Sequence, residues 1–426
     1  MYIYQKLLII LGIVMPFSFA LSPTATIDLN ILKIFIPIVF LFWLASSLLR
    51  KTILLDNRLR FWLLLIFLLI VFLSFFWTPA PKSALRKILF LLSTALIYPS
   101  FYAASFSAVF VNKFLKNLIF GAFLVACVSL IFFLLQFIIG LDPTLHILRI
   151  YTMPVFLGDS LSILVNQYSS WLVNIAGTTI LRTFGTFPDP HLFSLYLSML
   201  LPINIYLYKQ LAQKKYLVFF AVMLLAVLLS FSRSAYLAII IGFMFLLFNS
   251  ISQSLFKKKI LLMYITFISL LFLVIIPNPL TLRLQSSFNL QEGSNSGRIE
   301  MWETAWTLIK ENPYWGVGLG GFAETLNSAL GIRNPIYAHN LFLDFGAETG
   351  IVNAFILLML LLCPILFFLN YKSINSSDNL SKFIATSFVI FFISSLFETP
   401  FFSVRVFPLF LILLAIKIPS NKLIPK

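Results

Sequence analysis

Long apolar runs recur along almost the whole chain, and they constrain its fold more than any other feature. A helix that crosses the hydrocarbon core of a bilayer, about 30 Å thick, needs about 20 mainly apolar residues. Hydrophobic residues make up 61% of the 426 residues and charged residues only 10%, whereas soluble domains have about 25% charged residues. The sequence therefore predicts an all-α polytopic membrane protein.

About twelve runs are long enough to count as transmembrane helices. They cover residues 7–21, 31–49, 61–77, 88–110, 114–140, 191–208, 216–231, 235–248, 260–277, 341–370, 383–396 and 402–418. The first run has the length of a signal-peptide core, but further apolar runs follow it, so we interpret it as the first transmembrane helix. Because no fixed-period repeat and no separate soluble region is recognisable, we expect residues 1–426 to form a single transmembrane domain.

The formal net charge of +16 predicts how these helices are oriented. In a soluble protein such a charge would suggest nucleic-acid binding. Here the lysines gather in loops on one side of the predicted topology, as in the clusters at 113–116, 214–215 and 257–259. This arrangement satisfies the positive-inside rule if both termini are cytoplasmic. We therefore expect the lysines to contact membrane lipids, and we expect no nucleic-acid partner.

Two predicted external segments interrupt the short loops. Residues 141–190 are expected to lie along the membrane interface, and residues 278–340 to form a large external loop. Within that loop, residues 294–297 are typical of a turn, and residues 298–310 predict an amphipathic helix ended by Asn312. Its apolar stripe contains Ile299, Trp302, Trp306 and Ile309. Tryptophans at this spacing favour the headgroup layer, so the helix is expected to roof a cavity between the spans; an interfacial strut is the alternative.

A candidate polar site lies at the end of this loop. His339 and Asn340 precede a predicted helix, and the free N–H groups at a helix N-terminus favour anions. A hydrogen-bonded structural histidine is the alternative interpretation of His339. Asp344 and Glu348 follow on the same helix, and an acid such as Glu348 near membrane depth is costly unless it is paired or faces a polar cavity.

Three arginines lie on the same predicted face. Arg233 stands at a tight junction between two spans, Arg298 begins the amphipathic helix, and Arg182 precedes a later span. Because Arg233 is so close to lipid, it needs an anionic partner, which is either a ligand phosphate or a protein carboxylate such as Glu398. Together with the helix end at His339, Arg233 and Arg298 could form a diphosphate site.

Other patterns in the chain carry less chemistry. The glycines of residues 316–321 resemble a phosphate-binding loop only superficially, because no predicted strand precedes them, so a flexible lid or a tight turn is expected. His146, His191 and His339 are widely spaced and no carboxylate cluster accompanies them, which argues against a metal site. Both cysteines lie inside apolar runs, so a disulfide is not expected.

Five short motifs occur in order between residues 182 and 350. They are RTFGTF at 182–187, SRSAYLA at 232–238, GRIEMW at 297–302, NPYWGVG at 312–318, and AHN at 338–340 with ETG at 348–350. In order and spacing, these motifs resemble those of the bacterial O-antigen ligase and O-antigen polymerase superfamily. The flanking spans resemble that superfamily only in hydropathy and number.

The resemblance implies a function and roles for individual residues. Members of the superfamily move a glycan from undecaprenyl diphosphate to an acceptor hydroxyl on the periplasmic side, without a metal or other cofactor. Carried over to this chain, the resemblance implies catalytic roles for His339, Arg298 and Arg233. Diphosphate contacts are expected from Arg233, Arg298 and Arg182, and supporting roles from Asn340, Glu348 and Trp302.

The same resemblance implies a location and leaves several functions open. The chain is expected in the bacterial inner membrane, with its site and the 278–340 loop facing the periplasm or exterior. An O-antigen ligase would use lipid A core as acceptor, whereas a polymerase would extend a growing lipid-linked glycan. A protein O-oligosaccharyltransferase shares this chemistry. A transporter or flippase of lipid-linked glycans is the alternative from another class, but the candidate residues cluster at the outer rim rather than near the midplane.

Overall fold

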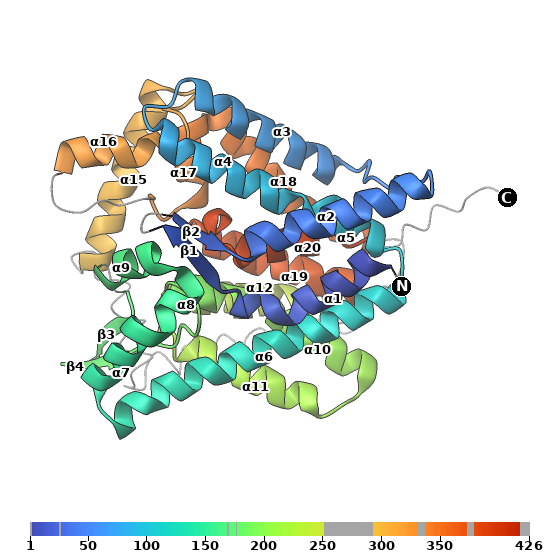
Figure 1. Cartoon of the computed structure of the whole chain (residues 1–426), viewed down its shortest axis with the longest axis horizontal. Coiled ribbons are helices and arrows are strands. Elements are labelled where there is room, and N and C mark those ends of the chain that lie inside the picture. Colours follow the sequence, from blue (N-terminus) through green and yellow to red (C-terminus); the bar gives the residue numbers. More distant parts are fainter. Residues whose placement is uncertain are drawn as a thin grey trace.

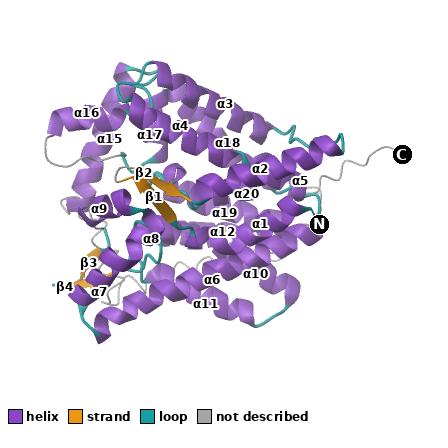
Figure 2. Ribbon diagram, in the orientation of Figure 1, coloured by secondary structure: helices purple, strands orange, loops and turns teal. Residues whose placement is uncertain are grey.

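The computed structural model describes residues 2–24, 27–167, 170–175, 177–250, 293–330, 337–372 and 379–417. The chain is mostly helical (Figure 1; Figure 2). Its first half contains α1 (Ile3–Val14), η1 (Met15–Phe17), β1 (Ala20–Thr24), β2 (Ile27–Asn30), α2 (Leu32–Leu49), α3 (Leu59–Leu73), η2 (Ser74–Phe76), α4 (Pro81–Ala95), α5 (Ile97–Ala104), α6 (Ala108–Ile138), α7 (Leu141–Ile147), η3 (Leu148–Thr152), α8 (Met153–Leu157), α9 (Asp159–Gln167), β3 (Leu172–Ile175) and β4 (Thr178–Leu181). The remaining elements are α10 (Pro190–Leu211), α11 (Lys215–Leu228), α12 (Arg233–Ser250), α15 (Gly293–Glu311), α16 (Gly321–Leu330), α17 (Leu341–Thr349), α18 (Ile351–Lys372), α19 (Asn379–Ser395), η6 (Pro400–Phe402) and α20 (Val406–Ala415).

Six helical segments in the described ranges are long and apolar enough to cross a membrane, so the predicted count of twelve is not confirmed. These six are Leu32–Leu49, Leu59–Phe76, Pro81–Ala104, Ala108–Ile138, Pro190–Leu211 and Ile351–Leu369. The shorter apolar helices are Ile3–Phe17, Lys215–Leu228, Arg233–Asn249, Leu380–Ser395 and Val406–Ala415. The predicted span at 260–277 lies outside the described residues.

Helix breaks explain part of the difference from the predicted spans. The run at 341–370 was expected to be one helix, but Gly350 with φ +86° separates α17 from α18. A Cβ atom at this position would overlap the carbonyl oxygen of Tyr314, so only glycine allows the close approach. The predicted run at 88–110 is likewise divided among α4, α5 and the start of α6. Hydropathy alone does not show such breaks.

Two small β-hairpins correct the all-α expectation. β1 pairs with β2 and β3 pairs with β4, each as a two-stranded antiparallel sheet. In the first hairpin, Asp28 accepts a hydrogen bond from the backbone N–H of Leu161 at 2.7 Å, which ties the hairpin to α9. The described residues between 141 and 190, a segment expected to lie along the interface, form short helices, a hairpin and the loop that leads to α10.

The helices enclose one large apolar core that joins distant parts of the chain. α19 packs against both α10 and α12, and α6 packs against α1 and α11. A smaller cluster joins α15 and α16 to α17, and its buried members are Ala305, Leu308, Ile309, Phe322, Ala338 and Ala347. α15 is thereby fixed on the end of α17, at the side of Figure 1 opposite the N-terminus.

α15 differs from its prediction at its start. Residues 294–297 were expected to form a turn, but α15 already begins at Gly293, so this expectation is wrong. The helix ends at Glu311, immediately before Asn312, as the sequence predicted. On its stripe, Ile309 is buried, whereas Trp306 remains 53% exposed.

The first described residues and the last ones lie at the same end of the molecule. The guanidinium of Arg50, which follows α2, stacks 3.6 Å from the ring centroid of Tyr2. The ammonium of Lys417, which follows α20, lies 3.5 Å from the ring centroid of Phe106. Arg60 at the start of α3 donates to the carbonyl of Ile416 at 3.2 Å. We call this the basic end; the opposite end of α20 carries the site described next.

Candidate functional site

The site is built around Glu398, which lies in the turn between α19 and η6 and is only 6% exposed. Arg298 on α15 donates from Nη2 to its Oε1 at 2.9 Å. The Nδ1 atom of His339 lies 3.2 Å from its Oε2, and the Nδ1 atom of His191 lies 3.5 Å from its Oε1. One buried carboxylate thus connects four segments that are far apart in the sequence. We call these four residues the Glu398 cluster.

His339 occupies a strained position just before α17. Its backbone has φ +52°, a region that residues other than glycine rarely adopt. The next residue, Asn340, is the N-cap of α17, and its Oδ1 accepts hydrogen bonds from two backbone N–H groups of the first turn. The Nδ2 of Asn340 also donates to the carbonyl of Leu396 at 3.1 Å. Asn340 therefore joins the His339 segment to the turn that carries Glu398.

A second clamp comes from Asp344 on α17. One oxygen of this buried carboxyl accepts from the backbone N–H of Ala338 at 2.6 Å, and the other accepts from the hydroxyl of Thr399. Ala338 precedes His339 in the chain, and Thr399 follows Glu398. The two clamps, Asn340 and Asp344, hold the imidazole and the carboxylate in register with each other.

The charges of the cluster shift its pKa values. Burial by itself would raise the pKa of Glu398, but His191, His339 and Arg298 outweigh burial and lower that pKa to about 2. Burial lowers the pKa of His339, but the hydrogen bond to Glu398 and the charge of that carboxylate reverse the effect, so the pKa is raised. The site therefore holds a fixed negative charge beside an imidazole that binds its proton more tightly than usual.

Asp189, next to the cluster, has the opposite behaviour. Burial and the nearby charge of Glu398 raise its pKa to about 6. Its Oδ1 nevertheless caps α10, accepting from the backbone N–H groups of His191 and Leu192 at 2.8 Å each. This cap positions His191, whose Nδ1 also lies 3.1 Å from the hydroxyl of Ser232.

The structure brings some of the predicted site residues together. Arg298 and His339 meet at Glu398, as described. Arg233 is the first residue of α12 and follows Ser232 directly, so it belongs to the segment that contacts His191. Trp302 donates from its indole to the carbonyl of Ala338 at 2.9 Å and so packs α15 against the His339 segment.

Two predicted residues have other partners. Arg182 is 3% exposed, and its guanidinium donates to the carbonyls of Ser230 at 2.6 Å and Ser170 at 2.9 Å. These contacts favour a packing role, and its expected diphosphate contact stays a prediction. Glu348 pairs with Lys87 of α4 at 3.1 Å, which supplies the partner that a buried acid requires.

The glycine-rich segment forms tight turns, one of the two expected outcomes. Gly316, Gly318 and Gly320 all have positive φ, at 64°, 87° and 82°. The backbone N–H of Gly318 donates to the carbonyl of Glu348 at 2.8 Å, and that of Val317 to Ala347 at 2.9 Å. The segment is thus bound to the C-terminal end of α17, and these glycines serve backbone packing.

Two members of the Glu398 cluster, Glu398 and His191, were not predicted as site residues from the sequence. Glu398 was considered only as a partner for Arg233, and His191 only as a metal ligand. The cost of an acid at the end of an apolar run, applied to Glu348, was an equally valid signal at Glu398. Among the described residues, no group of three or more His, Cys, Asp or Glu side chains could hold a metal ion. Cys127 and Cys363 are both free thiols.

The apolar helices and the Glu398 cluster define a membrane protein with a polar, charged site at one end of its helices. Residues 218–358 match the family model described as "O-Antigen ligase". This match confirms the predicted resemblance to the O-antigen ligase and polymerase superfamily, and it includes four of the five motifs. The remaining motif, at 182–187, lies outside the matched region, and so do His191 and Glu398.

A protein of Haemophilus influenzae (strain ATCC 51907 / DSM 11121 / KW20 / Rd), described as "Uncharacterized protein", is also similar. It is 28% identical to this chain over 116 residues. The similar segment covers 26% of this chain and 29% of that relative.

Proposed function

We propose that this protein is an O-antigen ligase-like glycosyltransferase. It moves a glycan from undecaprenyl diphosphate to an acceptor hydroxyl, with lipid A core as the acceptor that we favour. The observation that carries the proposal is the pairing of His339 with Glu398. The Nδ1 atom of His339 faces the carboxylate, while 42% of the side chain stays exposed. Its second ring nitrogen, Nε2, is therefore left for a substrate.

His339 acts as the general base. The Glu398 carboxylate accepts a hydrogen bond from the Nδ1–H group, which selects the tautomer whose Nε2 carries a lone pair. Nε2 takes the proton of the acceptor hydroxyl as the hydroxyl oxygen attacks the anomeric carbon of the donor glycan. The bond between that carbon and the diphosphate oxygen breaks, and undecaprenyl diphosphate leaves with the electron pair.

Arg233 and Arg298 stabilise the leaving diphosphate. A guanidinium has five N–H donors, so Arg298 can hold Glu398 with one of them and still donate to a phosphate. Arg233 reaches the same group from the first turn of α12. Charge stabilisation of this kind is most effective where water is excluded, as it is around the buried Glu398.

The charges at the two ends of the molecule support an orientation in the membrane. The basic end carries Arg50, Arg60 and Lys417, which by the positive-inside rule faces the cytoplasm together with both termini. The Glu398 cluster at the other end of α20 then faces the periplasm or exterior. In that arrangement the inner membrane presents the lipid-linked donor directly to the site.

Transfer by purified protein tests this proposal. Wild type and His339→Ala are incubated with undecaprenyl-diphosphate-linked glycan and either lipid A core or a second lipid-linked glycan. We expect transfer to lipid A core, and a loss of about 10²- to 10⁴-fold in the variant, because a general base is removed. His146→Ala is the matched control, since His146 lies exposed on α7.

The other outcomes separate the alternatives. Extension of the second lipid-linked glycan, with lipid A core untouched, would identify a polymerase. Undiminished transfer by His339→Ala would remove the general-base role. Movement of intact lipid-linked glycan across proteoliposomes, without covalent transfer to either acceptor, would favour the transporter.

A further inference from the structure

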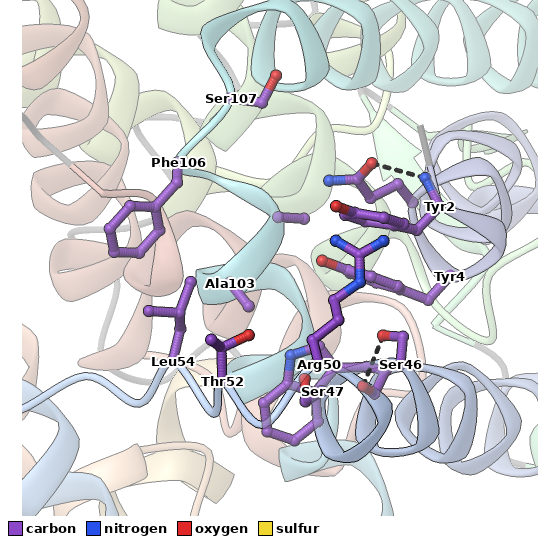
Figure 3. A pocket seen from close by; sticks show the side chains of 13 residues that line it. Tyr2, Tyr4, Ser46, Ser47, Arg50, Thr52, Leu54, Ala103, Phe106 and Ser107 are labelled. Atoms are coloured by element: carbon purple, nitrogen blue, oxygen red, sulfur yellow. Dashed lines mark hydrogen bonds between the residues drawn. The ribbon is translucent and has the colours of Figure 1, made fainter.

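A pocket of about 310 Å³ opens at the basic end, far from the Glu398 cluster (Figure 3). It lies between the start of α1, the end of α2 and the turn from α5 to α6. Its lining includes Tyr2, Tyr4, Trp43, Ser47, Arg50 and Thr52. This lining contains an arginine and several hydroxyl groups but no acid. We call it the Arg50 pocket.

The guanidinium of Arg50 is held in place before any ligand binds. Its central carbon lies 3.6 Å from the ring centroid of Tyr2, and the ring of Tyr2 is parallel to that of Tyr4 within 9°. Figure 3 shows the guanidinium beside these two rings. A planar guanidinium stacked on an aromatic ring keeps its edge free for two parallel hydrogen bonds to a phosphate.

Trp43 gives an independent indication of a ligand. Its side chain is 2% exposed and lines the pocket, and its indole Nε1 has no hydrogen-bond partner among the described residues. A buried N–H without a partner costs free energy, so native proteins rarely leave one unpaired. Because Nε1 itself is covered by protein in this structure, the indole has to turn slightly toward the pocket before an acceptor oxygen there can remove this cost.

The surroundings of the pocket favour an anion attached to a lipid. Lys51 is the next residue after Arg50, and the ammonium of Lys417 lies against the ring of Phe106. The nearest acid in the chain segment after α2, Asp56, is already occupied by Arg60 and Tyr98. Leu48 and Leu49, on the last turn of α2, are 58% and 87% exposed, so acyl chains have an apolar surface beside the charged pocket.

We propose that the Arg50 pocket binds the phosphate group of an anionic membrane lipid. Arg50 donates two hydrogen bonds to the phosphate, and the hydroxyls of the lining and the indole N–H of Trp43 supply further donors. The acyl chains lie along the apolar end of α2. This site is separate from the Glu398 cluster and does not depend on the proposed transferase activity.

Lipid retention in native mass spectrometry tests the proposal. Full-length protein is reconstituted with phosphatidylglycerol or phosphatidylcholine, and retained lipid is counted for wild type, Arg50→Ala and Lys51→Ala. We expect wild type to retain phosphatidylglycerol and Arg50→Ala to retain about tenfold less, because a charge-assisted contact is lost. Lys51→Ala is the matched control, since Lys51 is an adjacent exposed cation outside the lining, and it should retain lipid like wild type.

Two further arms keep the test decisive. Arg50→Lys keeps the charge and removes the planar donor pair, and Trp43→Phe keeps an aromatic ring and removes the N–H. Each variant should retain less phosphatidylglycerol than wild type. Its melting temperature in phosphatidylcholine should equal that of wild type. If Arg50→Ala and Lys51→Ala lost equal amounts of lipid, surface charge alone would explain retention, and the Arg50 pocket would not be the binding site. Displacement of phosphatidylglycerol by millimolar inorganic phosphate would show that the pocket binds free phosphate rather than a lipid. Equal retention of phosphatidylcholine would show that the pocket does not prefer anionic lipids.

Discussion

Two buried carboxylates occupy opposite ends of the molecule, and each is paired with an arginine. At the basic end, the Asp56 side chain is fully buried and accepts from Arg60 Nε at 3.0 Å and from the Tyr98 hydroxyl at 2.7 Å. At the other end, Glu398 faces Arg298 at 2.9 Å together with two histidines. Each cluster thus contains a carboxylate and a guanidinium, and the two clusters differ in the remaining partners.

That difference separates a structural clamp from a reactive site. Arginine and tyrosine keep their charge states near neutral pH, and Arg60 uses a further donor to hold the carbonyl of Ile416, so the Asp56 cluster fixes α3 to the end of α20. An imidazole changes its charge near neutral pH. At Glu398 one such ring is substantially exposed. Burial and ion pairing therefore do not identify the candidate site; an exposed, titratable partner does.

The largest expected effect comes from Asp56→Ala. Removing the carboxylate leaves Arg60 buried without its partner, which costs about 3 to 5 kcal/mol of stability. Thermal unfolding in detergent measures the loss, and transfer per folded molecule should stay unchanged. Asp142→Ala, which removes an exposed acid on α7, is the control. Loss of transfer without loss of stability would show that the two clusters do not differ as described.

Arg298→Ala tests the corresponding arginine at the other end. We expect transfer to fall about 10²- to 10³-fold, because a donor that stabilises the leaving diphosphate is removed. Arg298→Lys should restore part of the rate, since the charge returns without the bidentate geometry. Arg86→Ala, an exposed arginine on α4, controls for a general loss of positive charge. A melting temperature lowered as far as in Asp56→Ala, with transfer retained, would make Arg298 a structural clamp as well.

The same comparison shows what the sequence could predict. Apolar runs predicted a helical membrane protein, and the five motifs predicted a resemblance to a superfamily, which the family match at residues 218–358 confirms. His339 was expected at a helix N-terminus, and α17 begins two residues later. These expectations depend on local pattern, which a sequence displays directly.

Pairings between distant segments could not be predicted in the same way. Glu398 is 59 residues from His339 and 100 from Arg298 in the chain, and no periodicity links these positions. The sequence likewise gave no sign that Gly350 must be glycine to admit the carbonyl of Tyr314. Both features arise from tertiary packing. Packing also explains why one apolar run, such as residues 341–370, forms two helices.

Glu398→Gln is expected to change the pH dependence of transfer. Transfer requires neutral His339, so the wild-type rate falls as pH drops through the raised pKa of this residue. Glutamine keeps a hydrogen-bond acceptor but removes the negative charge that stabilises the imidazolium. The pKa of His339 then falls, and the acidic limb of the rate profile moves about 1 to 3 pH units lower. An unchanged limb in a profile of transfer against pH would show that Glu398 does not set the charge of His339.

His191→Phe should produce the smallest change, in the opposite direction. The Nδ1 atom of His191 lies 3.5 Å from Glu398 and shares the carboxylate with His339. Without this neighbour the negative charge of Glu398 acts more fully on His339, so the pKa of His339 rises and the acidic limb moves to higher pH, by less than about one unit. His146→Phe is the control, and the double variant Glu398→Gln/His191→Phe should match Glu398→Gln alone, because the charge through which His191 acts is gone. Loss of transfer in His191→Phe would instead assign the proton transfer to His191, and a limb that moved to lower pH would show that the two histidines do not share the charge of Glu398.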